Sequence, residues 1–202
     1  MGFLDALLGR SKQAAPNLEH LFGLPGARIT LQACENLSPT GHAGVCFKPA
    51  AGNDFTATEK EFADLLSLDG AGVTDASARL VEDTDEFGYR WVVVEAGDFD
   101  TLVTRVHMVN STFEDRGWGP ALLCSVFGFA PQKDATLANA TDKASTFLVY
   151  LYKRGSFYPF VPTGSQKRDN EAELRVKNEL AEDLSMEQDL DRWFPLWNLP
   201  VT

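Results

Sequence analysis

The chain has 202 residues, of which 44% are hydrophobic and 23% charged, as is ordinary for a globular protein with a substantial core. Its formal net charge of −11 argues against binding to nucleic acid and against unaided binding to an anionic membrane surface, since both attract Lys and Arg. No apolar run approaches the roughly 20 residues of a membrane span, so we expect no direct membrane insertion.

Residues 1–12 are predicted to form a short amphipathic helix that can detach from the rest of the protein. The opening stretch Met1–Arg10 reads MGFLDALLGR, and Ser11–Pro16 reads as a linker after it. The apolar side chains of one helical face are Phe3, Leu4, Leu7 and Leu8. A helix this short is not stable alone, so it must dock on the protein's own body, a partner protein or a membrane interface.

The next segments predict alternating helices and strands. Pro16–Phe22 has a helical pattern, whereas Ala27–Ala33 alternates and predicts a strand. A second strand, Gly44–Lys48, is expected after a turn formed by Ser38–Gly41. Thr58–Leu68 is predicted to be a helix with one apolar side.

The middle of the chain predicts a hairpin followed by a long helix. Arg79–Thr84 and Tyr89–Glu95 form the two strands of the hairpin. Asp98 then caps a helix, because its carboxylate can accept hydrogen bonds from the first helical turn. Gly117 follows the end of this helix. Its apolar residues at helical spacing are Phe99, Leu102, Val103, Val106, Val109 and Phe113.

The most distinctive stretch is Phe147–Val161, which predicts a hairpin that is apolar on both faces. Gly155 supplies the positive φ of a two-residue turn at Arg154-Gly155. The expected cross-strand pairs are Tyr152 with Phe157, Leu151 with Tyr158, and Val149 with Phe160. Before this hairpin we expect a strand at Pro120–Phe129 and a mobile loop at 131–144.

The C-terminal region predicts one helix and an aromatic tail. Asn170–Leu184 has an inward face containing Val176, with the pairs Glu171/Arg175 and Glu173/Lys177 outside. The tail, Leu190–Val201, should lie extended across an apolar surface. Its aromatic residues are Trp193, Phe194 and Trp197.

Strands in hairpin pairs separated by single helices predict an α+β fold, with an antiparallel sheet of hairpins covered by helices. We expect residues 1–202 to form a single domain. From Thr58 onward the order of helices and strands resembles the secretion-chaperone-like topology, which implies nothing certain about function.

Two residues suggest a candidate reactive site. His42 and Cys46 lie four apart at a strand start, so their side chains should share a face. They could be a nucleophile and base or metal ligands, but a metal site needs three or four ligands and no third lies nearby. Structural or incidental roles are favoured. Cys124 lies in an apolar strand and is expected to be a core residue. The chain has three cysteines and no visible secretory signal, which indicates reduced thiols in a cytosol.

Charge clusters offer two further candidates. Asp83, Asp85 and Glu86 gather at a hairpin tip, where solvated carboxylates are the default and a weak divalent-cation site is the alternative. The basic pairs Lys153-Arg154 and Lys167-Arg168 could face an acidic partner or simply keep an edge soluble.

Several stretches together resemble the PspAB family of PspA-associated proteins. They are the opening MGFLDALLGR, the stretch Val109–Cys124 (VNSTFEDRGWGPALLC), the hairpin Leu148–Pro159 (LVYLYKRGSFYP) with Lys167–Glu171 (KRDNE), and Asp191–Trp197 (DRWFPLW). The resemblance implies an accessory role linked to PspA, the coiled-coil protein of the envelope-stress response. It supplies no catalytic, metal-binding or cofactor-binding residues. It also implies a cytoplasmic location, with recruitment to the inner membrane face through PspA.

Two hypotheses about function follow. The first is a non-catalytic interaction protein that binds PspA or an associated membrane-stress component. Its candidate partner-binding residues are Phe3, Leu4, Leu7, Leu8, Trp193, Phe194 and Trp197. The second is an enzyme of unknown reaction with a site near His42 and Cys46.

Overall fold

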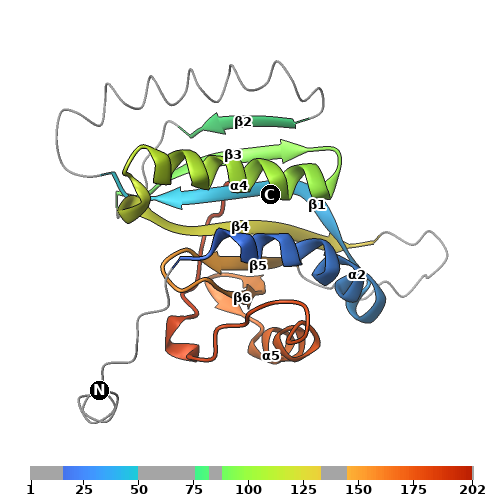
Figure 1. Ribbon diagram of the computed structural model, residues 1–202. Helices are drawn as coiled ribbons and strands as arrows, with labels where there is room; N and C mark the ends of the chain where they lie inside the picture. The colour runs from blue at the N-terminus through green and yellow to red at the C-terminus, as the bar shows by residue number, and fades with distance from the viewer. Residues whose placement is uncertain (1–15, 50–75, 82–87, 133–144, 202) are drawn as a thin grey trace, which may run out of the picture.

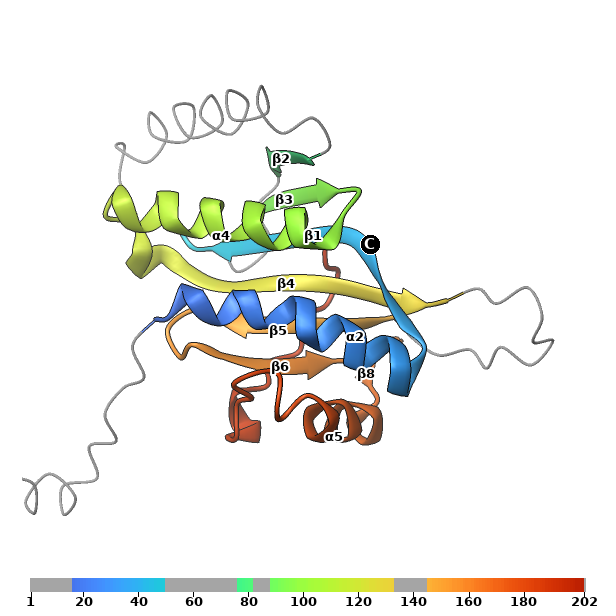
Figure 2. The ribbon, with the colours of Figure 1, turned by 45° about the vertical axis from the view of Figure 1, so that its right-hand side comes forward.

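A computed structural model describes residues 16–49, 76–81, 88–132 and 145–201, and it shows an α+β arrangement. Six antiparallel strands form one sheet in the order β2-β3-β1-β4-β5-β6 (Figures 1 and 2). In chain order the elements are η1 (Leu18–Gly23), α2 (Leu24–Glu35), β1 (Leu37–Phe47), β2 (Ala76–Leu80), β3 (Arg90–Ala96), α4 (Phe99–Asp115), η3 (Gly119–Ala121), β4 (Leu122–Pro131), β5 (Thr146–Leu151), β6 (Ser156–Phe160), β7 (Pro162–Gly164), β8 (Lys167–Arg168), α5 (Asn170–Glu179) and η4 (Leu190–Arg192).

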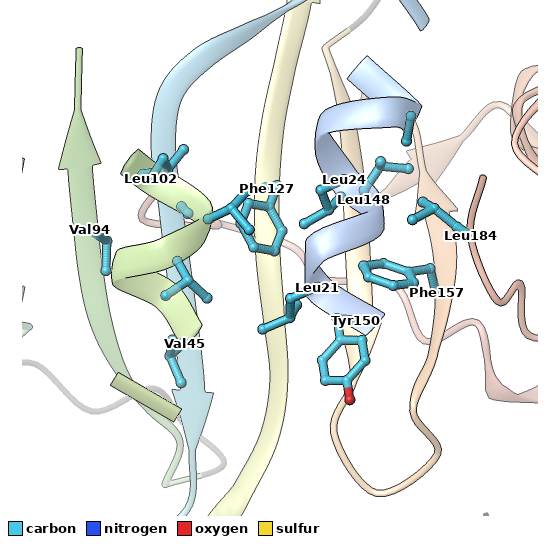
Figure 3. Close-up of a cluster of buried hydrophobic side chains, with 14 of the residues drawn as sticks. Leu21, Leu24, Val45, Val94, Leu102, Phe127, Leu148, Tyr150, Phe157 and Leu184 are labelled. Carbon is cyan, nitrogen blue, oxygen red and sulfur yellow. The ribbon is translucent and has the colours of Figure 1, made fainter. Parts of the chain in front are cut away.

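One face of the sheet is covered by η1, α2 and α4, which lie side by side (Figures 1 and 2). Leu21 and Leu24, at the junction of η1 and α2, and Leu102 of α4 lie over the strands of the sheet, with Leu148 of β5 near Leu24 (Figure 3). All four side chains are fully buried. Because apolar burial stabilises a fold in proportion to area, this layer is the main core of the described residues.

The opposite face of the sheet is covered by the C-terminal tail. Trp193, Leu199 and Val201 are buried there in a second apolar cluster. The tail residues pack on alternate residues of β1, β4, β5 and β6, among them Val126 and Val149. The sheet is therefore apolar on both faces, as the Phe147–Val161 pattern predicted.

Several predicted elements are confirmed. The hairpin before Asp98 is present as β2 and β3, which pair in antiparallel register, but its first strand, predicted at Arg79–Thr84, is found at Ala76–Leu80, and residues 82–84 lie outside the described residues. The Asp98 carboxylate accepts hydrogen bonds from the backbone N–H groups of Asp100 and Thr101, so it caps α4 as predicted. Gly117 follows α4 with a φ of +77°. The predicted C-terminal helix is present as α5 but ends at Glu179.

The predicted strand at Ala27–Ala33 is wrong, because these residues lie in α2. Pro25 is tolerated in the first helical turn, and Asn36 ends the helix in the left-handed conformation at φ 55°. The buried residues of α2 follow helical spacing, namely Leu24, Ala27, Leu31 and Glu35. In a strand, Ile29 would share a face with Ala27 and Leu31, but in α2 it is 63% exposed while those two are buried.

The turn predicted at Ser38–Gly41 is also wrong, because β1 runs through it. Gly41 takes a φ of +81°, and the register with β4 shifts between Pro39 and Ala43. A bulge therefore absorbs the turn residues. Pro39 is tolerated because at that point β1 pairs with β4 alone, pairing with β3 beginning at His42.

The Phe147–Val161 hairpin is confirmed, but its predicted register is wrong by two residues. Val149 pairs with Tyr158 and Leu151 with Ser156, so the turn spans four residues. A two-residue type I′ turn needs positive φ at both central residues. Gly155 has it at +63°, but Arg154 is not among the residues with positive φ. A shift of two preserves the alternation, so each side chain keeps its predicted face.

The ion pairs predicted on the outer face of the last helix, Glu171/Arg175 and Glu173/Lys177, are wrong, because Arg175 and Glu173 have other partners. Arg175 pairs with Glu35 of α2, whereas Glu173 is buried and pairs with Arg168. The predicted helices at 1–12 and Thr58–Leu68 lie outside the described residues, as does most of the predicted loop 131–144. The resemblance to the secretion-chaperone-like topology starts at the Thr58–Leu68 helix, so it is not confirmed.

Candidate interaction surface

The aromatic tail is fixed to the sheet by Trp193. Its ring stacks on Tyr158 of β6 with centroids 5.9 Å apart, and its Nε1 donates to the Glu187 carbonyl oxygen at 3.3 Å. Trp197 packs edge-on against Phe160 with centroids 5.3 Å apart. Trp193 is thus a core side chain, and Trp197 is partly buried.

Phe194 is the exposed member of the predicted tail group, with 59% of its surface accessible. Its backbone carbonyl oxygen accepts a hydrogen bond of 2.7 Å from the Tyr158 hydroxyl. Burial raises the pKa of Tyr158, so the hydroxyl stays a donor at neutral pH. The backbone is held while the Phe194 ring faces solvent.

The tail is also held by charged side chains. Arg168 donates from Nη1 to the Trp193 carbonyl oxygen at 2.6 Å and from Nε to the Glu173 carboxylate. Burial raises the pKa of Glu173, although Arg168 and the Val161 N–H favour the ionised form. Of the basic pair Lys167-Arg168, the arginine is therefore committed to internal contacts.

The second basic pair behaves in the same way. Arg154 binds the Glu187 carboxylate through Nε at 2.9 Å, while Lys153 is exposed. Burial alone would raise the pKa of Glu187, but Arg154, the Asp189 N–H and the Ser156 hydroxyl outweigh it and lower that pKa to about 2. Neither arginine is available as a simple docking charge.

The described chain begins beside the β5–β6 turn. The Tyr150 hydroxyl donates to the Asn17 carbonyl oxygen at 2.8 Å, and burial raises the pKa of Tyr150 to about 12. His20 Nδ1 lies 2.6 Å from the Gly155 carbonyl oxygen. These contacts fix the point where the preceding residues join the body. The candidate residues Phe3, Leu4, Leu7 and Leu8 themselves lie outside the described residues.

A further apolar surface was missed by the sequence analysis. Phe22 of η1, Ile29 of α2 and Met108 of α4 are 47%, 63% and 39% exposed, and we call them the helix-layer patch. The Phe22 ring lies 4.8 Å from that of His107, the residue before Met108. The sequence signal that could have revealed this surface is that each of the three elements carries one apolar residue outside its row of buried residues.

The candidate reactive pair is not assembled. His42 and Cys46 share a face as predicted, but four residues of strand separate them by roughly 13 Å. His42 Nδ1 lies 3.8 Å from a Glu95 oxygen, both side chains being about two-fifths exposed, whereas Cys46 is buried. Within the described ranges no group of three potential metal ligands comes together. The acidic tip Asp83, Asp85 and Glu86 lies outside them.

The described fold is that of an α+β protein with a six-stranded antiparallel sheet and apolar side chains exposed on its helical layer. A family model, PspAB, PspA associated protein B, matches residues 1–201. The chain therefore belongs to the PspAB family, whose name implies association with PspA. Neither the curated proteins nor the solved structures gave a match. Across the described helices, none is long and apolar enough to cross a membrane.

Proposed function

We propose that this protein is a non-catalytic accessory protein of the PspA-linked envelope-stress response that binds its partner through apolar surface. The partner is PspA or a component associated with it. The protein would act in the cytoplasm and reach the inner face of the membrane through that partner.

The observation that carries this proposal is the helix-layer patch. Single exposed apolar residues are common, but Phe22, Ile29 and Met108 come from three neighbouring elements on one side of the sheet. Aromatic residues and methionine are enriched in interfaces relative to other surface. A coiled-coil partner offers helices whose apolar side chains could cover such a surface.

The N-terminal residues extend the same argument. Phe3, Leu4, Leu7 and Leu8 are apolar residues at helical spacing, and their segment joins the body just before η1, which carries Phe22. One partner helix could therefore contact both the segment and the patch. Phe194 on the opposite layer would be a separate and weaker contact.

The test is capture of the purified protein by purified PspA, with three variants. Deleting residues 1–12 should abolish capture and leave the melting temperature nearly unchanged. The double change Phe22→Ser with Ile29→Ser should weaken capture at least about tenfold, a loss of about 1.4 kcal/mol. Leu174→Ser is the matched control, because Leu174 is also exposed, at 43%, but lies on α5.

The outcomes separate the alternatives. Unchanged capture by the double variant would remove the patch from the interface. A much earlier melt of the truncated protein would make residues 1–12 a structural strap. If His42→Ala removed cellular function while fold and capture survived, an enzymatic role would replace this one.

A further inference from the structure

Two of the three cysteines face each other across the centre of the sheet. Cys46 of β1 is the direct partner of Cys124 of β4 in the antiparallel ladder. Their side chains are 3% and 6% exposed and belong to the cluster beneath the tail. Both residues carry thiols, as does the exposed Cys34.

The backbone places this pair within reach of a disulfide bond. Directly opposed residues of an antiparallel pair have Cα atoms about 4.5 to 5.5 Å apart, inside the range of about 4.4 to 6.8 Å found in disulfides. Their Cβ atoms lie about 4.5 to 5.5 Å apart, so closure to the usual 3.5 to 4.5 Å needs a shift of about 1 Å.

The sheet has a feature that can accommodate such a shift. The register between β1 and β4 changes immediately after Cys46, where Phe47 pairs with Leu122 instead of Leu123. A register change of this kind interrupts regular pairing and bends the strand locally. The strand next to Cys46 is therefore less constrained than an unbroken ladder.

We propose that Cys46 and Cys124 are a redox-modification site that closes to a reversible cross-strand disulfide in the presence of a peroxide. In the first step one thiol attacks the peroxide, becoming a sulfenic acid and releasing water. The second thiol then attacks that sulfur, forming the S–S bond and releasing a second water. Two thiols and one hydrogen peroxide thus give one disulfide and two waters.

The tail controls access to this site. Both thiols are buried in the same apolar cluster as the tail residues Leu199 and Val201, which are 9% and 1% exposed, so an oxidant reaches them only when this cluster opens. Terminal segments open locally at a lower free energy than the whole fold. A disulfide that needs a strand shift is easier to reduce than a relaxed one, so the modification is reversible by ordinary thiols.

The test uses the full chain carrying Cys34→Ser, which removes the exposed thiol at a surface position. After treatment with hydrogen peroxide, the intact mass should fall by two hydrogen atoms. Peptide mapping should join the peptides of Cys46 and Cys124, and a reductant should separate them. The control, Cys34→Ser with Cys124→Ala, should lose no hydrogen. Two thiols that remain intact, or become oxidised without a link, would overturn the proposal.

A second arm tests the role of the tail. Val201 lies against the sheet, its Cγ1 being 2.8 Å from the position that a Cβ on Gly44 would take. Val201→Ala in the Cys34→Ser chain should therefore loosen the tail and accelerate disulfide formation several-fold. An equal or lower rate would overturn access through the tail.

Discussion

The two faces of the sheet are closed by different kinds of structure. On one face, η1, α2 and α4 satisfy much of their own backbone hydrogen bonding, so their side chains need only fit the sheet. On the other face, the tail has little regular structure beyond the three-residue η4. Its backbone must find partners elsewhere, and it uses the Tyr158 hydroxyl and Arg168.

This difference determines where each face is vulnerable. The helical face depends on many apolar contacts distributed over three elements, so its loss means loss of the fold. The tail face depends on one apolar cluster and a few polar contacts made by a segment with little regular structure, so it can open while the sheet persists. Substitutions on the two faces should therefore differ in both size and character.

The largest effect is expected on the helical face. Val106 of α4 is fully buried, so Val106→Asp would leave a carboxylate without a partner among apolar side chains. We expect a loss of more than about 4 kcal/mol and no cooperative melt by circular dichroism. The control Met108→Asp, two residues along the same helix at 39% exposure, should change stability by about 0.5 kcal/mol or less. A near-native melt of Val106→Asp would contradict the placement of α4.

On the tail face, two adjacent aromatic residues form a matched pair. Trp193→Ala removes a buried ring, its stacking on Tyr158 and one hydrogen bond, so we expect a loss of about 3 kcal/mol in urea unfolding. Phe194→Ala removes an exposed ring and should cost about 0.5 kcal/mol or less. Limited proteolysis should cut the Trp193→Ala tail while the sheet stays intact. Equal effects for the two variants would show that the tail is not held by Trp193.

The β5–β6 turn joins the two faces, and its substitution should affect both. Gly155 has a φ of +63°, which a β-branched residue adopts only with strain, so Gly155→Val should cost about 2 kcal/mol. Gly155→Asn should cost less, because asparagine tolerates this conformation. Urea unfolding of both variants provides the measurement. Equal losses of stability in the two variants would mean that steric crowding of the new side chain, rather than the positive φ of residue 155, causes the destabilisation.

On the helical face, α4 was predictable from the sequence, whereas α2 beside it was taken for a strand. The α4 helix followed from the Asp98 cap and apolar residues at helical spacing, both of which are local properties. The tail was predicted from composition alone, which could not distinguish the buried Trp193 from the exposed Phe194. That difference depends on Tyr158, which lies 35 residues away in the sequence.

The errors have the same origin. Alternation at Ala27–Ala33 indicated a strand, but burial of Leu24, Ala27 and Leu31 against the sheet selects the helix. The helix-layer patch escaped notice because exposure of Phe22 and Ile29 is decided by how η1 and α2 pack. Similarly, no spacing rule joins Cys46 to Cys124, since only the pairing of β1 with β4 brings them together.

The smallest predicted effect concerns acid sensitivity at the base of the tail. The pKa of Glu187 is lowered from 4.5 to about 2, because contacts with Arg154, Asp189 and Ser156 outweigh burial, which acts in the opposite direction. A carboxyl group with a lowered pKa stabilises the fold above about pH 4.5, and that contribution is lost as the pH falls toward 2. Arg154 is about one-third exposed, so solvent screening reduces the contribution to about 1 kcal/mol.

Glu187→Gln should therefore lose about 1 kcal/mol in urea unfolding at pH 7 and show a shallower loss of stability than the wild type between about pH 5 and pH 3. Glu182→Gln makes the same chemical change at an exposed position and should retain the wild-type acid profile. If Glu187→Gln followed the wild-type curve throughout, the Arg154–Glu187 contact would contribute nothing to stability. The polar attachment of the tail would then rest on Arg168, the Tyr158 hydroxyl and the hydrogen bond from Trp193 Nε1 to the Glu187 backbone carbonyl, none of which involves the Glu187 carboxylate.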